Sequence, residues 1–491
     1  MDNLENLAPP DQKEIHKSSS FSSSTTLNPM ESRRILWKID LVLVPMMGIS
    51  NFLMFLDKTT LSYANLMGIK ADNHLTGQQL SWLGSLFYLG YLAWQIPAGY
   101  LLQRLPIRWH LSGMIIAWGT VLCAHAACTN FAGLATCRFL LGVTESVMIP
   151  AFTTLTGMFY KAEEQYARVS LWFGTIGIAQ IVGGAMSYGI ARMDASQHVL
   201  NQWQTLFLIT GVITVVFGLI CLFIVPSTPS DAWFLTHQER ISAIERLSSD
   251  KRGTVSYDFE FYQVREALFD PRLYLVGLSV FALAIPNGGV TSFGAVIIQG
   301  FGYSTLQTLL LGMSTGASEI AAVAVGYVIA RYTNTRVAPA TTMHCMAIVG
   351  ASLMIGSGVS RNVQFAGYCL TAWSPVSIVY LLSWMSSMIS GQTKRIVYYV
   401  FYQLCYAAGN VIGSNIFRES DAPAYVAAKT GVLAGYVVDV VAFAAIAFLH
   451  FKWNRSKDAT ALEKKNLEEE ENDLQFLNKT DFEVSSFRWP Y

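Results

Sequence analysis

Two opposite charges, Arg138 and Glu145, lie seven residues apart within the apolar run 131–154. Seven residues span close to two turns of a helix, so both side chains face the same way, about 10 Å apart along the axis. An arginine binds anions through its planar fork, and a glutamate can take up and release a proton. The spacing therefore predicts a face that binds an anion and handles a proton. The alternative is a structural charge pair between helices.

A second pair of charges, Asp57 and Lys58, lies near the end of the apolar run 39–62. Neighbouring residues on a helix point about 100° apart, so these two do not form a simple ion pair. We expect one side chain to line a cavity and the other to hold a neighbouring helix. The alternative is that both are interfacial, because a lysine can extend its amine to the membrane surface.

Further polar residues lie inside apolar runs and are weaker candidates. Those that we expect to hydrogen-bond a substrate are Tyr88, Gln180 and Asn410. Each of them is equally suited to a hydrogen bond with a neighbouring helix. Glu319 is a candidate second proton site or a structural partner, whereas Asp439 is expected to serve packing.

Two short motifs predict irregular helices. Pro286-Asn287-Gly288-Gly289 suggests that the run 273–296 breaks there and that the freed backbone lines a cavity as an outer gate. Trp373-Ser374-Pro375 suggests a kink in the run 364–386.

The spacing of the cysteine and histidine residues indicates neither a metal site nor a disulfide. The seven cysteines fall in or beside apolar runs without a CxxC motif, and the histidines show no ligand spacing. We therefore expect packed thiols, no metal and no cofactor.

Twelve apolar runs must position these residues, each near the 20 residues that a spanning helix needs. They are residues 39–62, 78–101, 108–127, 131–154, 166–190, 203–225, 273–296, 305–329, 337–357, 364–386, 395–417 and 430–451. The fold class expected is an all-α membrane protein embedded in the lipid bilayer, with twelve transmembrane helices in two six-helix bundles.

Composition supports this class. The 491 residues are 52% hydrophobic and only 13% charged, against about 25% charged in soluble proteins. The net charge is zero, which leaves no basic surface for nucleic acid.

Lysine and arginine set the expected orientation, because they gather on the cytoplasmic side. With both termini cytoplasmic, 26 of the 33 Lys and Arg residues lie inside and 6 lie outside, while Arg138 lies within a helix.

The spacing of the runs divides the chain into two halves around a polar centre. The expected parts are a disordered cytoplasmic N-tail at 1–38, a six-helix bundle at 39–225, a cytoplasmic central loop at 226–272, a second bundle at 273–451 and a cytoplasmic C-tail at 452–491. This 6+6 plan is the pattern of the major facilitator fold.

Two segments carry a resemblance to a known family. Asp57-Lys58-Thr-Thr-Leu-Ser-Tyr-Ala and Arg138-x-x-x-Gly142-x-x-Glu145, with the twelve-run layout, resemble the anion:cation symporter family of the major facilitator superfamily, and within it the fungal allantoate permease group. The resemblance implies that Lys58 and Arg138 hold a substrate carboxylate. It also implies that Asp57 and Glu145 take part in proton coupling.

Two departures from superfamily patterns bear on the activity. The loop after the second run has Gln103 and Pro106 where the superfamily signature has Asp and Gly, which weakens the usual inside-gate charge relay. The run 166–190 lacks the Gly-Pro of the antiporter signature, which disfavours drug-type antiport.

The expected function is import of a small organic anion with protons, by a monomer in the plasma membrane. The resemblance implies a carboxylate such as allantoate, nicotinate or pantothenate. Alternatives are a facilitator, an exporter of a fungal metabolite, or a nutrient sensor that does not transport. An intramembrane enzyme is not expected, because no catalytic constellation lies at membrane depth.

Overall fold

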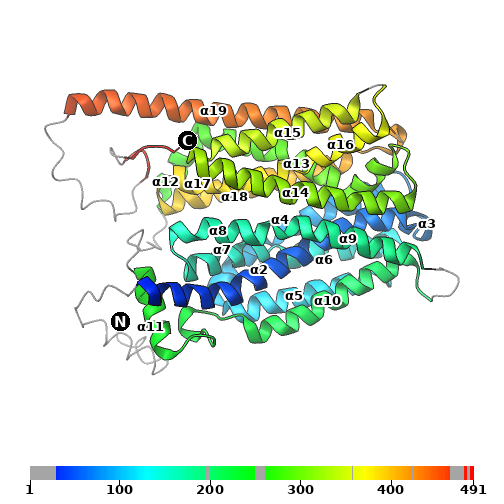
Figure 1. The fold of residues 1–491 in the computed structure, drawn as a ribbon, viewed down its shortest axis with the longest axis horizontal. Helices are drawn as coiled ribbons and strands as arrows, with labels where there is room; N and C mark the ends of the chain where they lie inside the picture. Colours follow the sequence, from blue (N-terminus) through cyan, green and yellow to red (C-terminus); the bar gives the residue numbers. More distant parts are fainter. Residues whose placement is uncertain are drawn as a thin grey trace.

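The computed structural model describes residues 29–193, 199–248, 260–356, 358–422, 424–464, 480–483 and 487–490. Regular structure in this part of the chain is helical. The helices run side by side along the long axis of the molecule (Figure 1). The start of α2 and the end of α19 lie at the same end of the bundle, which we call the proximal end; α3 lies at the opposite, distal end.

The first half of the chain supplies one bundle. Its helices are α2 (Pro29–Leu66), α3 (Ile69–Asp72), α4 (Gln79–Arg104), α5 (Ile107–His125), α6 (Phe131–Glu145), α7 (Met148–Phe159), α8 (Ala162–Phe173), α9 (Thr175–Ala191) and α10 (Gln202–Ile224). Short helices then follow in the central segment: η3 (Pro229–Asp231), α11 (His237–Ser248) and α12 (Phe261–Phe269).

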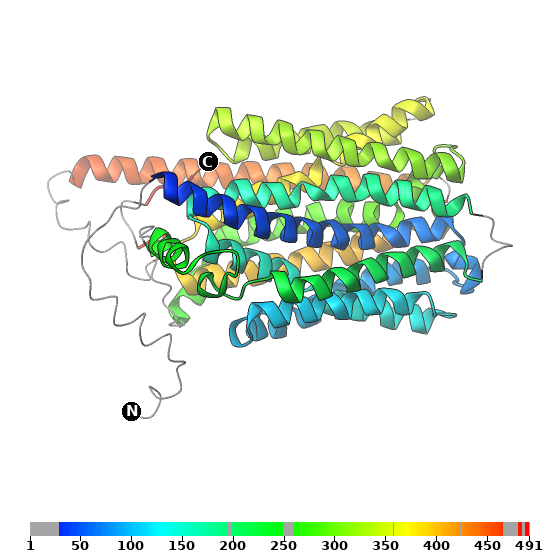
Figure 2. The same ribbon diagram turned by 60° about the horizontal axis from the view of Figure 1, so that its bottom comes forward.

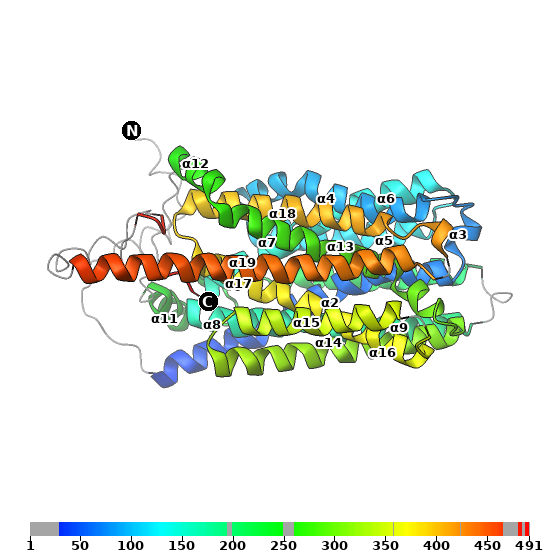
Figure 3. The ribbon, with the colours of Figure 1, turned by 90° about the horizontal axis from the view of Figure 1, so that it is seen from above.

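The second half supplies the other bundle. Its helices are α13 (Pro271–Gln299), α14 (Thr305–Thr333), α15 (Val337–Ile355), α16 (Arg361–Thr371), η4 (Ser374–Val376), α17 (Ser377–Met388), α18 (Gln392–Asn415), η5 (Glu419–Asp421) and α19 (Val426–Lys464). Helix α19 runs the length of the bundle between α13 and α15 (Figure 3). Its C-terminal part extends beyond the other helices at the proximal end (Figure 2).

Nine helical segments within the described residues are long and apolar enough to cross a membrane. Helices α4, α5 and α18 occupy the remaining positions of the twelve-run plan and lie among these nine (Figure 1). The all-α membrane class and the two-bundle fold are confirmed.

Capping residues start several of these helices where the apolar runs begin. The Asn130 side chain accepts a hydrogen bond from the Gly133 backbone N–H at 2.9 Å and so begins α6. Ser304 and Gln307 form a reciprocal capping box at the start of α14. Asp270 caps α13, whose first residue is a proline.

Glycines allow the two bundles to approach each other closely. A Cβ on Gly177 of α9 would lie 2.6 Å from the carbonyl oxygen of Gly316 on α14, and the reverse clash also holds. Within the first bundle, a Cβ on Gly142 of α6 would likewise clash with the α4 backbone at Phe87. Small residues therefore set the spacing of the helices that carry the candidate site.

Several expectations about local structure need correction. Helix α13 does not break at Pro286–Gly289: it is continuous through Gln299, with Pro286 inside it, so no gate forms from free backbone there. The central segment contains helices rather than only a loop, and α2 begins ten residues before the expected boundary. The kink near Pro375 is confirmed, because α16 and α17 are separated by the turn η4.

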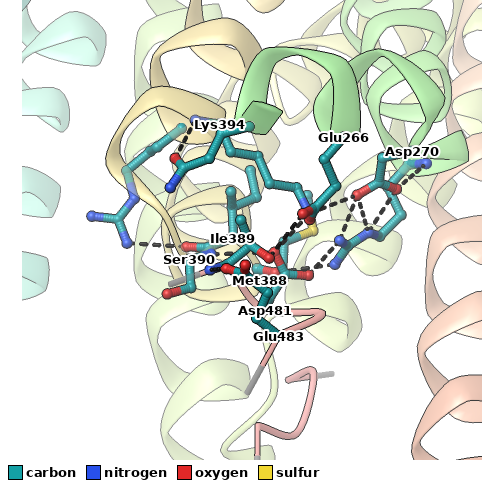
Figure 4. Close-up of polar contacts among 12 residues, drawn as sticks. Glu266, Asp270, Met388, Ile389, Ser390, Lys394, Asp481 and Glu483 are labelled. Carbon is teal, nitrogen blue, oxygen red and sulfur yellow. Dashed lines mark hydrogen bonds and ion pairs between the residues drawn. The ribbon is translucent and has the colours of Figure 1, made fainter. Parts of the chain in front are cut away.

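Residues 480–483 and 487–490 pack against the second bundle. Figure 4 shows Asp481 among Lys394, Glu266 and Asp270. The Asp481 carboxylate is fully buried and forms ion pairs with Arg272 at 2.5 Å and Lys394 at 2.8 Å. The Trp489 indole donates a hydrogen bond to Asp481, and the Trp489 backbone bonds the Asn454 side chain. These two short segments are therefore part of the folded second bundle. Residues 1–28, where the sequence predicts disorder, lie outside the described residues.

Candidate functional site

Helices α2 and α6 bring the four charges of the first bundle together. The Lys58 ammonium lies 3.4 Å from a Glu145 carboxylate oxygen. Arg138 interacts electrostatically with both Asp57 and Glu145. Asp57 and Glu145 are fully buried and Arg138 is 3% exposed. The sequence placed these residues on two helices, and the structure joins them into one cluster.

Trp118 of α5 orients Asp57. Its indole N–H donates a hydrogen bond to Asp57 Oδ2 at 3.0 Å, while Oδ1 has no hydrogen-bond partner among the described residues. The Asp57 carboxyl also lies close enough to that of Glu145 for the two to interact. Two carboxyl groups and the two cations Lys58 and Arg138 thus lie in one buried cluster.

Arg138 keeps unused hydrogen-bond donors inside the bundle. Its guanidinium lies over the ring of Phe207, 5.5 Å from the centroid. Its Nε and one Nη find no hydrogen-bond partner within the described part of the chain. Buried donors without partners are costly to leave, by about 1–3 kcal/mol, so an anion that accepts from them would be bound favourably.

Lys58 is the most accessible of the four charges. Its side chain is 18% exposed, and its ammonium lies 5.3 Å from the centroid of the Phe87 ring on α4. A point charge on a flexible stem can exchange one anionic partner for another. The Lys58 ammonium can therefore leave Glu145 for another anionic partner.

A cavity lies between the two bundles on their distal side, with walls from both. Its lining includes Gln180, Asn287, Glu319 and Tyr436, together with side chains of α2 and α16. Neither Lys58 nor Arg138 lines it. The cavity is therefore separate from the charged cluster, and a few polar side chains lie in its mostly apolar lining.

Gln180 and Glu319 join the two bundles across this cavity. Gln180 Nε2 of α9 donates to Glu319 Oε2 of α14 at 2.5 Å, and the Thr315 hydroxyl donates to Gln180 Oε1 at 2.5 Å. Glu319 is 2% exposed, and its other oxygen has no hydrogen-bond partner among the described residues. The sequence singled out both residues but did not pair them.

Tyr88 and Asn410 make the helix-to-helix contacts that the sequence left open. The Tyr88 ring is buried and packs edge-on against Tyr406, with centroids 6.3 Å apart. Asn410 is also buried and accepts a 2.8 Å hydrogen bond from Asn287. Asn287 is the member of this group that lines the cavity.

Asp439 lies away from both sites, within the second bundle. Its carboxylate pairs with His344 of α15 at 2.5 Å and accepts a hydrogen bond from Ser279 of α13. All three are fully buried, so Asp439 connects three helices. Sequence reasoning missed His344 and Trp118 as partners, because a single side chain in an apolar run carries no signal of what it faces.

Metal binding is not indicated by the geometry. No group of three or more His, Cys, Asp or Glu side chains suited to a metal ion is found among the described residues.

Comparisons with known proteins show the family to which the chain belongs. Residues 47–414 match the family model described as Major Facilitator Superfamily. The chain is 36% identical to an allantoate permease of Saccharomyces cerevisiae, over 94% of this chain and 87% of that protein. It is 37% identical to an uncharacterised transporter of Schizosaccharomyces pombe, over 94% and 90% of the two chains. A thiamine pathway transporter of Saccharomyces cerevisiae is 32% identical, over 96% and 88%.

Among solved structures, the fold resembles that of a bacterial homologue of the human lysosomal transporter Spinster, in an inward-facing and unoccupied conformation. The TM-score is 0.62 at 14% sequence identity, over 83% of this chain and 96% of that one. At that identity the likeness concerns the fold alone.

Proposed function

Because the chain belongs to the major facilitator superfamily of membrane transporters, we propose that it imports a small organic anion together with a proton. One observation carries the proposal: the Lys58–Glu145 ion pair lies beside Arg138, which has unused donors. Lys58 thus belongs both to the proposed anion site and to an ion pair with the ionisable carboxyl group of Glu145. The relatives are transporters and not enzymes, and the same holds for this chain.

Substrate binding begins at the cations. A carboxylate accepts hydrogen bonds from the free Arg138 donors and draws Lys58 toward itself. The arginine fork orients the carboxylate, and the lysine adds a movable charge. Because one lysine cannot neutralise two anions equally well, the Lys58–Glu145 contact weakens as the substrate enters.

Proton coupling follows from charge balance in the cluster. Asp57, Lys58, Arg138 and Glu145 sum to zero in the empty protein. An anion adds one negative charge to buried surroundings, which is unfavourable. A proton on Glu145, with Asp57 in contact, restores the balance and lets the loaded site pass between the two sides.

Alternating access requires contacts between the bundles that open and close. At the distal end, Ser62 accepts a hydrogen bond from the backbone N–H of Ala295 at 3.0 Å, and Asn415 donates to Ser85 at 2.7 Å. We propose that these bonds, with the Gln180–Glu319 bridge, hold the distal side closed in this conformation. Rocking of the bundles would break them and expose the site to the other face.

The proposed orientation puts the proximal end, with both termini, in the cytoplasm and the distal end outside. The bias of Lys and Arg toward the proximal side supports it. The plasma membrane is the proposed location, with a monomer as the working unit.

The proposed substrate class is a small carboxylate. Arg138 and Lys58 select the anionic group, and the name of the allantoate permease supports a compact nitrogen-containing acid among the candidates. Nicotinate and pantothenate belong in the same panel.

Uptake of a panel of radiolabelled carboxylates, in cells lacking their own transporters, tests the proposal. We expect accumulation of at least one of them, faster at acidic than at neutral external pH and abolished by a protonophore. Accumulation that ignores the pH gradient for every transported compound would contradict proton coupling. Binding without uptake would favour the sensor.

A further inference from the structure

Two thiols face each other at the distal end of the first bundle. The Sγ atoms of Cys128 and Cys137 are 3.7 Å apart. Cys128 lies in the turn at residues 126–130 that joins α5 to α6, and Cys137 lies within α6. All seven cysteines fall in the described part of the chain, and this is the sulfur–sulfur contact found there.

The local fold explains why the two sulfurs meet. Asn130 caps α6 through the Gly133 backbone N–H, which folds the turn back over the first turns of the helix. Gly133 has no side chain to fill that space: a Cβ there would lie 3.2 Å from Cys128 Sγ. Gly133 and Cys137 are one turn apart on the same helix face. Cys128 therefore lies in the groove above Gly133, directly beside Cys137.

The turn is anchored on its other side as well. Gln204 of α10 donates a 2.9 Å hydrogen bond to the Ala126 carbonyl oxygen, and the Cys128 backbone N–H donates to the His125 carbonyl oxygen at 3.1 Å. The Cys128 backbone thus stays in place when its side chain rotates. Both cysteines are partly exposed, so a small solute can reach them.

We propose that Cys128 and Cys137 are a redox-sensitive pair that forms a reversible disulfide on exposure to a peroxide. In the orientation proposed above, the pair lies toward the outside, where disulfides persist. To form the bond, the sulfurs must approach from 3.7 Å to about 2.04 Å.

The chemistry balances with hydrogen peroxide as the oxidant. One thiolate attacks the peroxide O–O bond and becomes a sulfenic acid, while the displaced hydroxide takes up a proton to leave as water. The second thiol attacks that sulfur, forms the S–S bond and releases a second water. Two thiols lose two electrons and two protons in total, and the peroxide receives them.

The disulfide would restrain Arg138, the residue that follows Cys137 in α6. Arg138 lies over Phe207, against which the His125 ring at the end of α5 also stacks at 4.8 Å. A covalent bond from the turn to α6 would hold the start of this helix, with Arg138, against the end of α5. Oxidation would therefore restrain the segment that carries the proposed anion site.

Alkylation mass spectrometry on the full-length protein in membrane vesicles tests bond formation. After hydrogen peroxide treatment and blocking with N-ethylmaleimide, we expect the peptides of Cys128 and Cys137 to be linked, and separated by dithiothreitol. Cys128→Ser and Cys137→Ser should each abolish the link. Cys345→Ser, which alters an exposed cysteine on α15, should keep it. Full maleimide labelling of both cysteines after peroxide would overturn the proposal.

Amide hydrogen exchange tests the restraint without needing a substrate. We expect exchange across residues 131–138 to slow after peroxide treatment in the wild type and in Cys345→Ser, and to recover with dithiothreitol. Cys128→Ser should show no change. A disulfide that forms without slowing exchange there would overturn the link to Arg138. Neither readout depends on transport, so their failure leaves the proposed import of an anion separately testable.

Discussion

The ammonium of Lys58 on α2 lies 3.4 Å from the carboxylate of Glu145 on α6, at a point where Glu145 is fully buried. This pair connects two helices of the first bundle and places the most accessible cation of the cluster beside a buried carboxylate. Its energy depends on what else Lys58 contacts, because a buried carboxylate that loses its partner is strongly disfavoured. This is the contact through which we propose that anion entry is coupled to protonation.

Replacing Glu145 with glutamine removes the ionisable group while keeping its shape. We expect Glu145→Gln to abolish accumulation driven by a pH gradient and to retain exchange of external for internal substrate. Uptake and counterflow in the same vesicles measure the two activities. Glu31→Gln, at the exposed start of α2, is the matched control and should behave as wild type. Accumulation by Glu145→Gln would remove this residue from the coupling step.

Removing the guanidinium of Arg138 should weaken binding of the anion. A charge-assisted hydrogen bond contributes about 1.5–3 kcal/mol, so Arg138→Ala should raise Kd roughly ten- to a hundredfold. Arg138→Lys should recover part of that loss, because it keeps the charge and loses the fork. Arg192→Ala, at the distal end of α9, serves as the control. Unchanged affinity in Arg138→Ala, measured by substrate binding, would place the anion elsewhere.

The Gln180–Glu319 bridge should contribute to the stability of this conformation. Gln180→Ala leaves a buried carboxylate without its donor, and we expect a loss of about 1–3 kcal/mol. Glu319→Gln should reduce the effect of a second change at Gln180, since both act on one contact. Thermal unfolding of the single and double variants measures this coupling. Gln299→Ala, on the exposed end of α13, provides the control, and additive effects would exclude a shared contact.

Asp481 should stabilise the second bundle in a pH-dependent way. Burial by itself would raise the pKa of Asp481, but the positive charges of Arg272 and Lys394 outweigh it and hold that pKa below the ordinary value of 3.8. The stabilisation is therefore complete above the ordinary value and is lost as pH falls through the lowered pKa. Asp481→Asn should cost about 3 kcal/mol at neutral pH, as when one partner of a buried ion pair is removed.

Asp458→Asn is the matched control for Asp481, because Asp458 forms an exposed ion pair with Arg488. Exposed pairs contribute about 0–1 kcal/mol, so this variant should unfold near the wild-type temperature. Equal losses of thermal stability in the two variants would show that burial of Asp481 contributes nothing.

Local patterns in the chain were enough to predict the helical fold and the residues of the charged cluster. Apolar runs of sufficient length define spanning helices, because a bilayer leaves the backbone no other way to satisfy its hydrogen bonds. Charges are rare in such runs, so Asp57, Lys58, Arg138 and Glu145 stand out without any knowledge of their neighbours. The helical period also places Arg138 and Glu145 on one face.

The same patterns could not predict which residues on different helices contact each other. The helical period says which face of a helix a residue occupies but not which helix that face meets. The contacts of Lys58 with Glu145, Trp118 with Asp57, and Gln180 with Glu319 join residues 61 to 139 positions apart.

The sequence by itself thus determined the membrane class, the two-bundle plan and the four charges, because these follow from hydrophobic length and periodicity. Only the tertiary structure decided that Lys58 pairs with Glu145, that α13 continues through Pro286, and that Asp481 is buried against Arg272. These outcomes depend on how helices pack side by side, and close packing is set by shape across the whole bundle rather than by any one segment.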